Sequence, residues 1–324
     1  MKRSTRSLAR LFSSLDLAMA YHQVPVKPAV VAKTAFITHV GLYKMMKMPF
    51  GFSNAPSTYQ RLKMSVLQGL IGRLCLAYLE DVIVFSKRHN EHVNDLRAVL
   101  DRIRDGGLKL KPAKCKLLCK KVLYLGHVIS FSGVSPDPAK LRVLADWPLP
   151  TSVRKPQSFL GFMNYYSDFI DEQTALTSSL YDLTAARKGT EPVHFTHEDI
   201  ERFAEFKRRL CAAPCLAHPN LEAPFTLYTD ASQIAVGSVL LQRDTTGVER
   251  PISFFSKKLS SAQRNYSTFE RECFAVVCAL EHFRVYLLAR PFRLRIDHRA
   301  LQWLVSKEPK ASVRISGWLA TLIE

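Results

Sequence analysis

The segment Leu74–Ser86 constrains the fold of this chain more than any other, because it sets two adjacent acids between two short apolar runs. The second run, Val82–Phe85, consists of β-branched and aromatic residues that favour strands. The simplest interpretation is a β-hairpin with Glu80 and Asp81 at its turn. Two neighbouring carboxylates are costly unless water, a cation or a metal balances them, so an ordinary solvated turn is the alternative.

A third acid favours a functional site over an ordinary turn. Asp16 lies at the end of a second apolar segment, which begins at Leu11 and has the character of a strand. Two strands that both end in acids can place three carboxylates around one or two Mg²⁺ ions. Paired metals about 3.5–4 Å apart suit phosphoryl transfer, because they hold the attacking and the leaving oxygens.

These acids belong to an ordered series of motifs. The series comprises Phe12–Leu17, Tyr21–Gln23, Pro49–Pro56 with Gln60, Tyr78–Ser86, Lys109–Cys115 and Tyr124–Ile129. In this order and spacing it resembles the palm of a reverse transcriptase from the Pol polyprotein of a Ty3/gypsy-type long-terminal-repeat retrotransposon. The family carries two aspartates after Tyr-Leu, whereas this chain carries Glu80 followed by Asp81.

The resemblance implies an RNA-directed DNA polymerase site. Asp16, Glu80 and Asp81 would be its catalytic acids. With Asp16 and Asp81 as metal ligands, the site would hold two Mg²⁺ or Mn²⁺ ions. Glu80 keeps the charge of the family's aspartate, but its carboxylate stands one methylene further from the backbone.

The resemblance also implies a nucleotide-binding set. An aromatic residue at the position of Tyr21 lies under the sugar of the incoming deoxynucleoside triphosphate in the family, and a core tyrosine is the alternative on sequence alone. Phe50, Gly51 and Gln60 belong to the segment that lies beside the nucleotide in the family. Because Phe50 and Gly51 have no catalytic chemistry of their own, we expect them to shape the pocket.

From Pro224 onward the pattern resembles a ribonuclease H domain, with Thr229–Ser232 and Ile296–His298 as its strand signatures. Three acids fall at two strand ends and on one helix. They are Asp230, Asp297 and Glu272. The resemblance makes these three the catalytic acids and the ligands of two further Mg²⁺ or Mn²⁺ ions.

The helix predicted over Ser267–Leu288 offers two glutamates for that site. Glu270 fits a capping box with Ser267, which is a local structural role. Glu272 lies about 200° further round the helix at ~3.6 residues per turn, so both side chains cannot point into one site. The family pattern makes Glu272 the residue that faces the metal.

The charge of the chain favours a polyanionic partner. Lys and Arg number 46 against 28 Asp and Glu, which gives a formal net charge of +18. Lysines without an intervening acid follow Gly107, and we expect four of them to contact nucleic acid: Lys109, Lys111, Lys114 and Lys116. A solvated basic loop is the alternative. The predicted partners are RNA template, DNA primer, RNA–DNA hybrid and deoxynucleoside triphosphates. Beyond the lysines, Tyr124–Ser130 predicts one strand.

Seven scattered cysteines, an odd number, indicate reduced thiols in an intracellular protein, cytoplasmic or nuclear and not secreted. No run approaches the ~20 apolar residues of a membrane span, so we expect no membrane partner.

We therefore predict an α+β and α/β chain in three parts. Residues 1–146 would form a reverse transcriptase palm without its fingers, residues 147–218 a helical connection, and residues 219–324 a ribonuclease H-like mixed sheet with helices that is truncated before a fourth acid. The predicted function is RNA-directed DNA polymerase with ribonuclease H activity. The alternative is a non-catalytic nucleic-acid-binding remnant of a degenerate element, and a Mg²⁺-dependent activity would distinguish the two.

Overall fold

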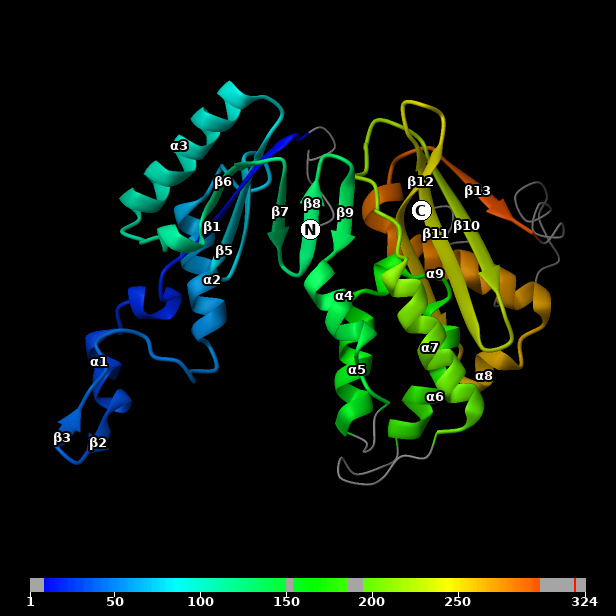
Figure 1. The fold of residues 1–324 in the computed structure, drawn as a ribbon, viewed down its shortest axis with the longest axis horizontal. Coiled ribbons are helices and arrows are strands. Elements are labelled where there is room, and N and C mark those ends of the chain that lie inside the picture. Colours follow the sequence, from blue (N-terminus) through cyan, green and yellow to red (C-terminus); the bar gives the residue numbers. More distant parts are fainter. Residues whose placement is uncertain (1–8, 150–153, 186–194, 298–317, 319–324) are drawn as a thin grey trace. The chain divides into compact units, whose positions relative to one another are not determined.

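The computed structural model describes residues 9–149, 154–185, 195–297 and 318 (Figure 1). The chain divides into two compact units, one that extends to Phe131 and one that begins at Ser132. Each unit has its own hydrophobic core. No helix in the described part of the chain is long and apolar enough to cross a membrane.

The first unit is built on a four-stranded sheet with the order β4-β5-β1-β6. Its strands are β1 (Leu11–Asp16), β4 (Cys75–Tyr78), β5 (Asp81–Ser86) and β6 (Lys116–Cys119). β1 runs antiparallel to both β5 and β6, and β5 runs antiparallel to β4. The two acid-bearing strands therefore lie next to each other at the centre of the sheet.

Both faces of this sheet are covered, because the side chains of β5 alternate between two cores. Val82 and Val84 pack with α2 (Ala55–Val66) and α3 (His89–Asp105), whereas Ile83 packs with the side chains of a second cluster that includes Phe12 and Tyr124. This burial on both faces explains why β5 is a continuous apolar run. The remaining elements before α2 are η2 (Ala20–Gln23), α1 (Pro28–Val31), η3 (Ala32–Thr34) and the hairpin β2 (Phe36–Thr38) and β3 (Gly41–Tyr43).

The structure of residues 109–130 differs from the sequence prediction at one place. The basic segment, for which a solvated loop was the alternative, forms β6 at the edge of the sheet after η4 (Pro112–Lys114). The single strand predicted over Tyr124–Ser130 is a hairpin of β7 (Lys121–Tyr124) and β8 (His127–Ser130). The turn of this hairpin lies at Leu125 and Gly126, whose φ angles are both positive at 47° and 67°. The sequence pattern did not predict it because the apolar residues continue on both sides of the turn.

The second unit begins with β9 (Gly133–Pro136), where Val134 forms a bridge with Leu216. Helices follow: α4 (Pro138–Ala145), α5 (Arg154–Tyr165), η5 (Ser167–Phe169), α6 (Gln173–Ala185) and α7 (His197–Cys211). The aromatic residues of this part, among them Phe159, Tyr166 and Phe206, are buried together. Thr196 is the N-cap of α7, and it forms a capping box with Asp199.

The rest of the second unit is a four-stranded mixed sheet with the order β12-β11-β10-β13. Its strands are β10 (Phe225–Ala231), β11 (Ala235–Arg243), β12 (Glu249–Lys258) and β13 (Phe292–Ile296), and β10 is parallel to β13. The short α8 (Ser261–Arg264) precedes α9 (Thr268–Leu287), which packs on one face of the sheet (Figure 1). α6 is fixed to β12 by the Lys258–Asp182 ion pair at 2.6 Å.

The mixture of helix and sheet confirms the predicted fold class. The division at Ser132 neither coincides with the predicted boundary after residue 146 nor separates the helical part from the second sheet. The division into residues 1–146, 147–218 and 219–324 therefore stays a prediction. Residues 298–317 and 319–324 of the third part lie outside the described residues.

Candidate active sites

The acidic hairpin forms where the sequence predicts it. Tyr78 of β4 lies opposite Asp81 of β5, which leaves Leu79 and Glu80 as the two turn residues. In the neighbouring strand, Asp16 is the register partner of Asp81. Directly opposed residues of an antiparallel pair have Cβ atoms about 4.5–5.5 Å apart, so the fold brings these two carboxylates side by side.

The turn that carries the acids is strained and is held from α2. Leu79 has a φ of 44°, in the left-handed region that costs a residue with a side chain about 1–2 kcal/mol. The Leu79 amide donates to Gln60 Oε1 at 2.9 Å, and Gln60 Nε2 donates to the Ala77 carbonyl at 3.1 Å. The Leu79 carbonyl accepts a hydrogen bond from the ammonium of Lys63. Gln60, which the resemblance sets beside the nucleotide, has its amide engaged by the hairpin in this structure.

Two lysines balance the paired aspartates. Burial and then the charge of Asp16 raise the pKa of Asp81, whereas Lys63 and Lys114 oppose that shift. Lys114 Nζ lies 3.3 Å from Asp16 Oδ2. Burial lowers the pKa of Lys63 to about 8, and the charges of Asp81 and Glu80 act in the opposite direction. The carboxylates of the hairpin are therefore partly neutralised by the protein itself.

The aromatic residues predicted for the nucleotide site lie together beside this hairpin. The rings of Tyr21 and Phe50 meet edge to face with centroids 5.4 Å apart, and Tyr21 contacts Tyr59 in the same way at 5.9 Å. Phe50 is 64% exposed and Gly51 has a φ of +94°, so both belong to an open turn. Burial, followed by the charges of Glu80 and Asp16, raises the pKa of Tyr59, which indicates that this aromatic group adjoins the acids.

The four predicted nucleic-acid-binding lysines are exposed along a segment that runs past Asp16. The Lys111 amide donates to the Asp16 carbonyl at 2.8 Å, and the Lys109 amide donates to Gln23 Oε1 at 2.6 Å. Lys116 of β6 is the register partner of Ser14 in β1. Of the four side chains, that of Lys114 forms the ion pair with Asp16 described above.

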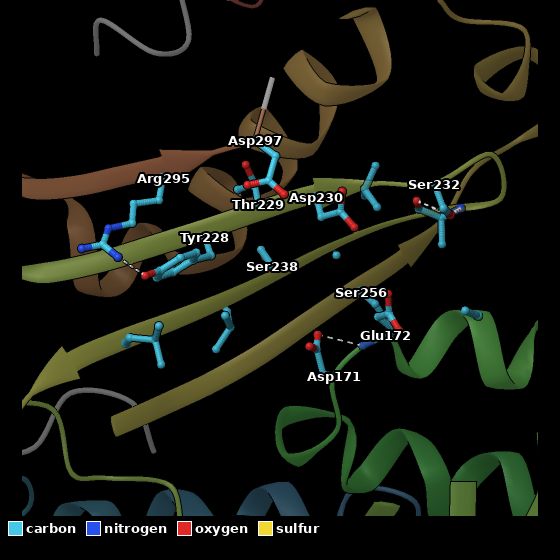
Figure 2. Close-up of a pocket in the computed structure, with 16 residues that line it drawn as sticks. Asp171, Glu172, Tyr228, Thr229, Asp230, Ser232, Ser238, Ser256, Arg295 and Asp297 are labelled. Carbon is cyan, nitrogen blue, oxygen red and sulfur yellow. Dashed lines mark hydrogen bonds between the residues drawn. The ribbon is translucent and has the colours of Figure 1, made fainter. Parts of the chain in front are cut away.

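The second unit gathers the other three acids. β10 and β13 are parallel, with Thr229 opposite Ile296, so Asp230 and Asp297 follow at the same edge of the sheet. Figure 2 shows both side chains on one side of a pocket of about 420 Å³. Burial and then the charges of Asp230 and Asp297 raise the pKa of Glu272 on α9 to about 7, which indicates that the helix brings its carboxylate close to theirs.

The capping role predicted for Glu270 on α9 is confirmed, and the metal-facing role of Glu272 stays a prediction. Glu270 forms the capping box with Ser267, whose amide donates to Glu270 Oε2 at 3.0 Å. Glu272 is only 7% exposed, and its Oε2 atom has no hydrogen-bond partner among the described residues. A buried carboxylate oxygen without a donor is costly unless a cation or a further donor reaches it.

The pocket has a second acidic wall that the sequence did not reveal. Asp171 and Glu172, from the turn between η5 and α6, lie on the side opposite Asp230 and Asp297 (Figure 2). Burial, the charge of Glu172 and, more weakly, that of Asp230 raise the pKa of Asp171. Along the sequence this pair appears only as two consecutive acids that follow a segment rich in aromatic residues. Its contact with the sheet is tertiary, so no local pattern predicts it.

The donor chemistry of both clusters fits Mg²⁺ or Mn²⁺, since carboxylate oxygens are the ligands that these hard cations prefer. As the side chains stand, no three His, Cys, Asp or Glu side chains within residues 9–149, 154–185, 195–297 and 318 are arranged to hold one ion. Mg²⁺ usually takes only one or two carboxylates and completes its shell with water and substrate phosphate. The Asp16–Asp81 pair and the unpartnered oxygen of Glu272 suit that mode.

Two known protein families match parts of this chain. Residues 2–129 match the model for reverse transcriptase (RNA-dependent DNA polymerase), and residues 195–294 match the RNase H-like domain found in reverse transcriptase. The Drosophila melanogaster Pol polyprotein from transposon 297 is 37% identical over 97% of this chain, and that from transposon gypsy is 32% identical over 96%. The chain covers 29% and 30% of those polyproteins, so it spans less than a third of their length.

Among solved structures, the foamy viral protease-reverse transcriptase dRH in complex with double-stranded DNA superposes with a TM-score of 0.86. The match covers 100% of this chain and 56% of that one at 20% identity, which establishes a common fold. The family resemblance predicted from the ordered motifs is confirmed by these matches.

Proposed function

We propose that this chain, whose residues 2–129 belong to the reverse transcriptase family and whose residues 195–294 belong to the RNase H-like domains of reverse transcriptases, acts on nucleic acid as the polymerase and nuclease of a retroelement Pol polyprotein. The observation that carries the proposal is the register of β1 with β5, which sets Asp16 opposite Asp81. Two unrelated stretches of sequence thereby supply one carboxylate pair at the end of a sheet.

The polymerase reaction is attack of a primer 3′-hydroxyl on the α-phosphate of a deoxynucleoside triphosphate. Two Mg²⁺ ions, when bound, supply Lewis-acid stabilisation of the attacking and leaving oxygens. Asp16 and Asp81 would hold them, and Glu80 would add a third carboxylate at the turn. Tyr21 lies beneath the sugar and Phe50 borders it, which is supported by the contact between their rings.

The nuclease reaction is hydrolysis of the RNA strand in an RNA–DNA hybrid. Asp230, Glu272 and Asp297 would hold the second pair of ions, and the unpartnered oxygen of Glu272 supports this assignment. Within this pocket Asp171 and Glu172 oppose an approaching phosphate backbone.

The same proposal extends to partners, location and organisation. The exposed lysines from Lys109 to Lys116 and the charge of +18 support binding to RNA template, DNA primer and RNA–DNA hybrid. The reduced cysteines support an intracellular location in the cytoplasm or nucleus. Residues 1–146 act as the palm, residues 147–218 as the connection, and residues 219–324 as the nuclease.

A second candidate is a nucleic-acid-binding remnant without catalysis. The presence of Glu80 where the family has an aspartate favours it, because positioned sites tolerate little displacement. Both candidates bind nucleic acid through the same basic surface. They differ in whether the carboxylate clusters support a metal-dependent reaction.

The deciding experiment assays the full chain with Mg²⁺ or Mn²⁺ for primer extension and for cleavage of RNA in a hybrid. We expect Asp81→Asn to abolish only extension and Asp230→Asn to abolish only cleavage. The matched controls are Asp105→Asn at the exposed end of α3 and Glu281→Gln on the exposed face of α9. Absence of both activities with nucleic-acid binding intact would establish the remnant, and activity that survives the substitutions or a chelator would refute the assigned sites.

A further inference from the structure

Lys63 on α2 is an unusual residue for the place it occupies. Its side chain is 0% exposed, and lysine is almost never fully buried unless it is paired. No carboxylate of the described residues lies within ion-pair distance of its ammonium. Instead the Nζ atom donates to the backbone carbonyl of Leu79 and lies 5.9 Å from the ring centroid of Tyr59.

The group that Lys63 binds is the peptide that precedes the acids. Leu79 is held in the left-handed region and is followed directly by Glu80 and Asp81. Gln60 fixes the amide of Leu79, one turn of helix before Lys63 fixes its carbonyl. Because the Leu79 carbonyl belongs to the peptide bond to Glu80, its orientation sets the direction in which the chain enters the catalytic acids.

We propose that Lys63 is a positioning residue that clamps the turn of the acidic hairpin, so that Asp81 and Glu80 keep a geometry ready for a divalent cation. The inference rests on the proposed polymerase site and assigns to it a residue outside its carboxylates. Lys63 touches neither nucleotide nor metal. It acts through the Leu79 peptide.

A simpler role for Lys63 would be that of a buried counter-ion, and the two roles predict opposite effects for Lys63→Met. Methionine has nearly the same length and volume but neither charge nor donor. Loss of a positive charge near the acids would by itself strengthen the binding of a cation. Loss of the clamp would weaken it, because the strained turn could relax and move the carboxylates.

The test is a titration of Mn²⁺ into the full chain, followed by electron paramagnetic resonance. The polymerase site is identified as the binding that Asp81→Asn removes, and the binding that Asp230→Asn removes serves as an internal control. We expect Lys63→Met to weaken the first by about fivefold or more, equivalent to roughly 1 kcal/mol, and to leave the second unchanged. Arg61→Met, which removes an exposed charge from the same helix, should change neither by more than about twofold.

Lys63→Gln separates donor from charge, since it keeps an N–H for the Leu79 carbonyl. The clamp predicts that Lys63→Gln binds Mn²⁺ more tightly than Lys63→Met does. Lys63→Leu, which also lacks charge and donor, replaces Lys63→Met if the latter fails to fold. Binding by Lys63→Met or Lys63→Leu that is tighter than wild type would overturn the clamp in favour of the counter-ion. If Asp81→Asn leaves Mn²⁺ binding as it is in the wild type, the polymerase site itself is refuted. If Asp81→Asn removes binding but no Lys63 variant changes it, only the clamp is refuted.

Discussion

The two carboxylate clusters are made of the same kind of residue but differ in how their charge is balanced. In the first unit, Asp16 and Asp81 are opposed by Lys114 and Lys63, and the turn between the strands is tied to α2. In the second unit, Glu272 is buried against Asp230 and Asp297, and the Ala231 amide and, more weakly, Arg271 act against the rise in its pKa. The first cluster is therefore the better balanced of the two, and the second holds more repulsion that a metal ion can relieve.

This difference has a physical consequence for metal binding. A balanced cluster keeps its shape without metal, and an incoming cation must displace a lysine such as Lys114. An unbalanced cluster is destabilising by itself, so metal binding should stabilise the second unit more than the first.

The largest expected effect concerns the geometry of the balanced cluster. Replacing Glu80 by aspartate withdraws the carboxylate by one methylene, roughly 1.5 Å on the covalent scale. Misplacement of about 1 Å in a positioned site can cost on the order of 10²-fold in rate. We expect Glu80→Asp to speed primer extension by at least about tenfold, measured at saturating nucleotide. Equal rates would mean that the clamped turn already accommodates the longer acid.

The next effect tests the repulsion in the unbalanced cluster. Since the pKa of Glu272 is raised to about 7, its burial favours the protonated form, and stability falls as the pH rises through that value. Glu272→Gln should therefore stabilise the metal-free chain at pH 8 by about 2 kcal/mol and have little effect at pH 5. Urea denaturation at both pH values measures this, with Glu281→Gln as the exposed control on the same helix. If Glu272→Gln instead lowers stability at pH 8, the charged carboxylate of Glu272 must already have favourable partners in the folded chain.

A smaller effect concerns the basic strip beside the first cluster. Lys114→Glu combined with Lys116→Glu should weaken binding to unrelated duplexes and hybrids alike, and should lower the log–log salt slope by about 0.9 for each lost phosphate contact on B-DNA. Fluorescence anisotropy over a range of salt concentrations measures both quantities. Lys140→Glu, in the exposed part of α4, is the control. If affinity is unchanged, the nucleic acid binds elsewhere on the chain.

The smallest effect tests a buried network at the end of β5 that is remote from Asp81. Ser13 Oγ lies 2.7 Å from His92 Nε2, His92 Nδ1 lies 3.0 Å from Ser86 Oγ, and Ser86 donates to Asp95 at 2.6 Å. Because Ser86 uses its proton toward Asp95, His92 donates from Nδ1 to Ser86 Oγ. Its burial, aided by His89 and opposed by Asp95, lowers its pKa.

A lowered histidine pKa gives stability that is complete above the unfolded value of about 6.5 and is lost as the pH falls below it. The His92 contribution to the free energy of unfolding should therefore fall between pH 7.5 and 5.5, and we expect His92→Gln to remove that contribution, which shifts the stability difference between the two pH values by up to about 1 kcal/mol in favour of the lower pH. His197→Gln, which alters an exposed histidine, should leave the pH dependence unchanged. An identical pH dependence in His92→Gln would exclude this network as its source.

The sequence predicted those parts of the sites that depend on local pattern. The hairpin around Glu80 follows from two apolar runs, and the different roles of Glu270 and Glu272 follow from helical spacing and a capping box. The assignment of Asp16, Asp230 and Asp297 as ligands came from the family resemblance and stays a prediction, although the strand registers bring each acid toward its partners.

The residues that the sequence missed depend on tertiary contacts. Lys63 lies at helical spacing from Tyr59 and Leu67 on an apolar stripe, but a helical lysine is ordinarily assigned to solvent. Asp171 meets the acidic pocket of the second unit only because α6 packs against β12. Such contacts have no periodic signature along the chain, which explains why both the clamp and the second acidic wall were visible only in three dimensions.

Hydrogen exchange with and without Mg²⁺ compares the two clusters in one measurement. The Leu79 amide is already hydrogen-bonded to Gln60, so exchange in the turn should slow by less than about threefold when Mg²⁺ is added. The start of α9 and the end of β10, which hold Glu272 and Asp230, should gain about tenfold or more in protection. Equal or greater protection of the hairpin would contradict the account, because it would mean that the first cluster, not the second, needs the metal to hold its shape.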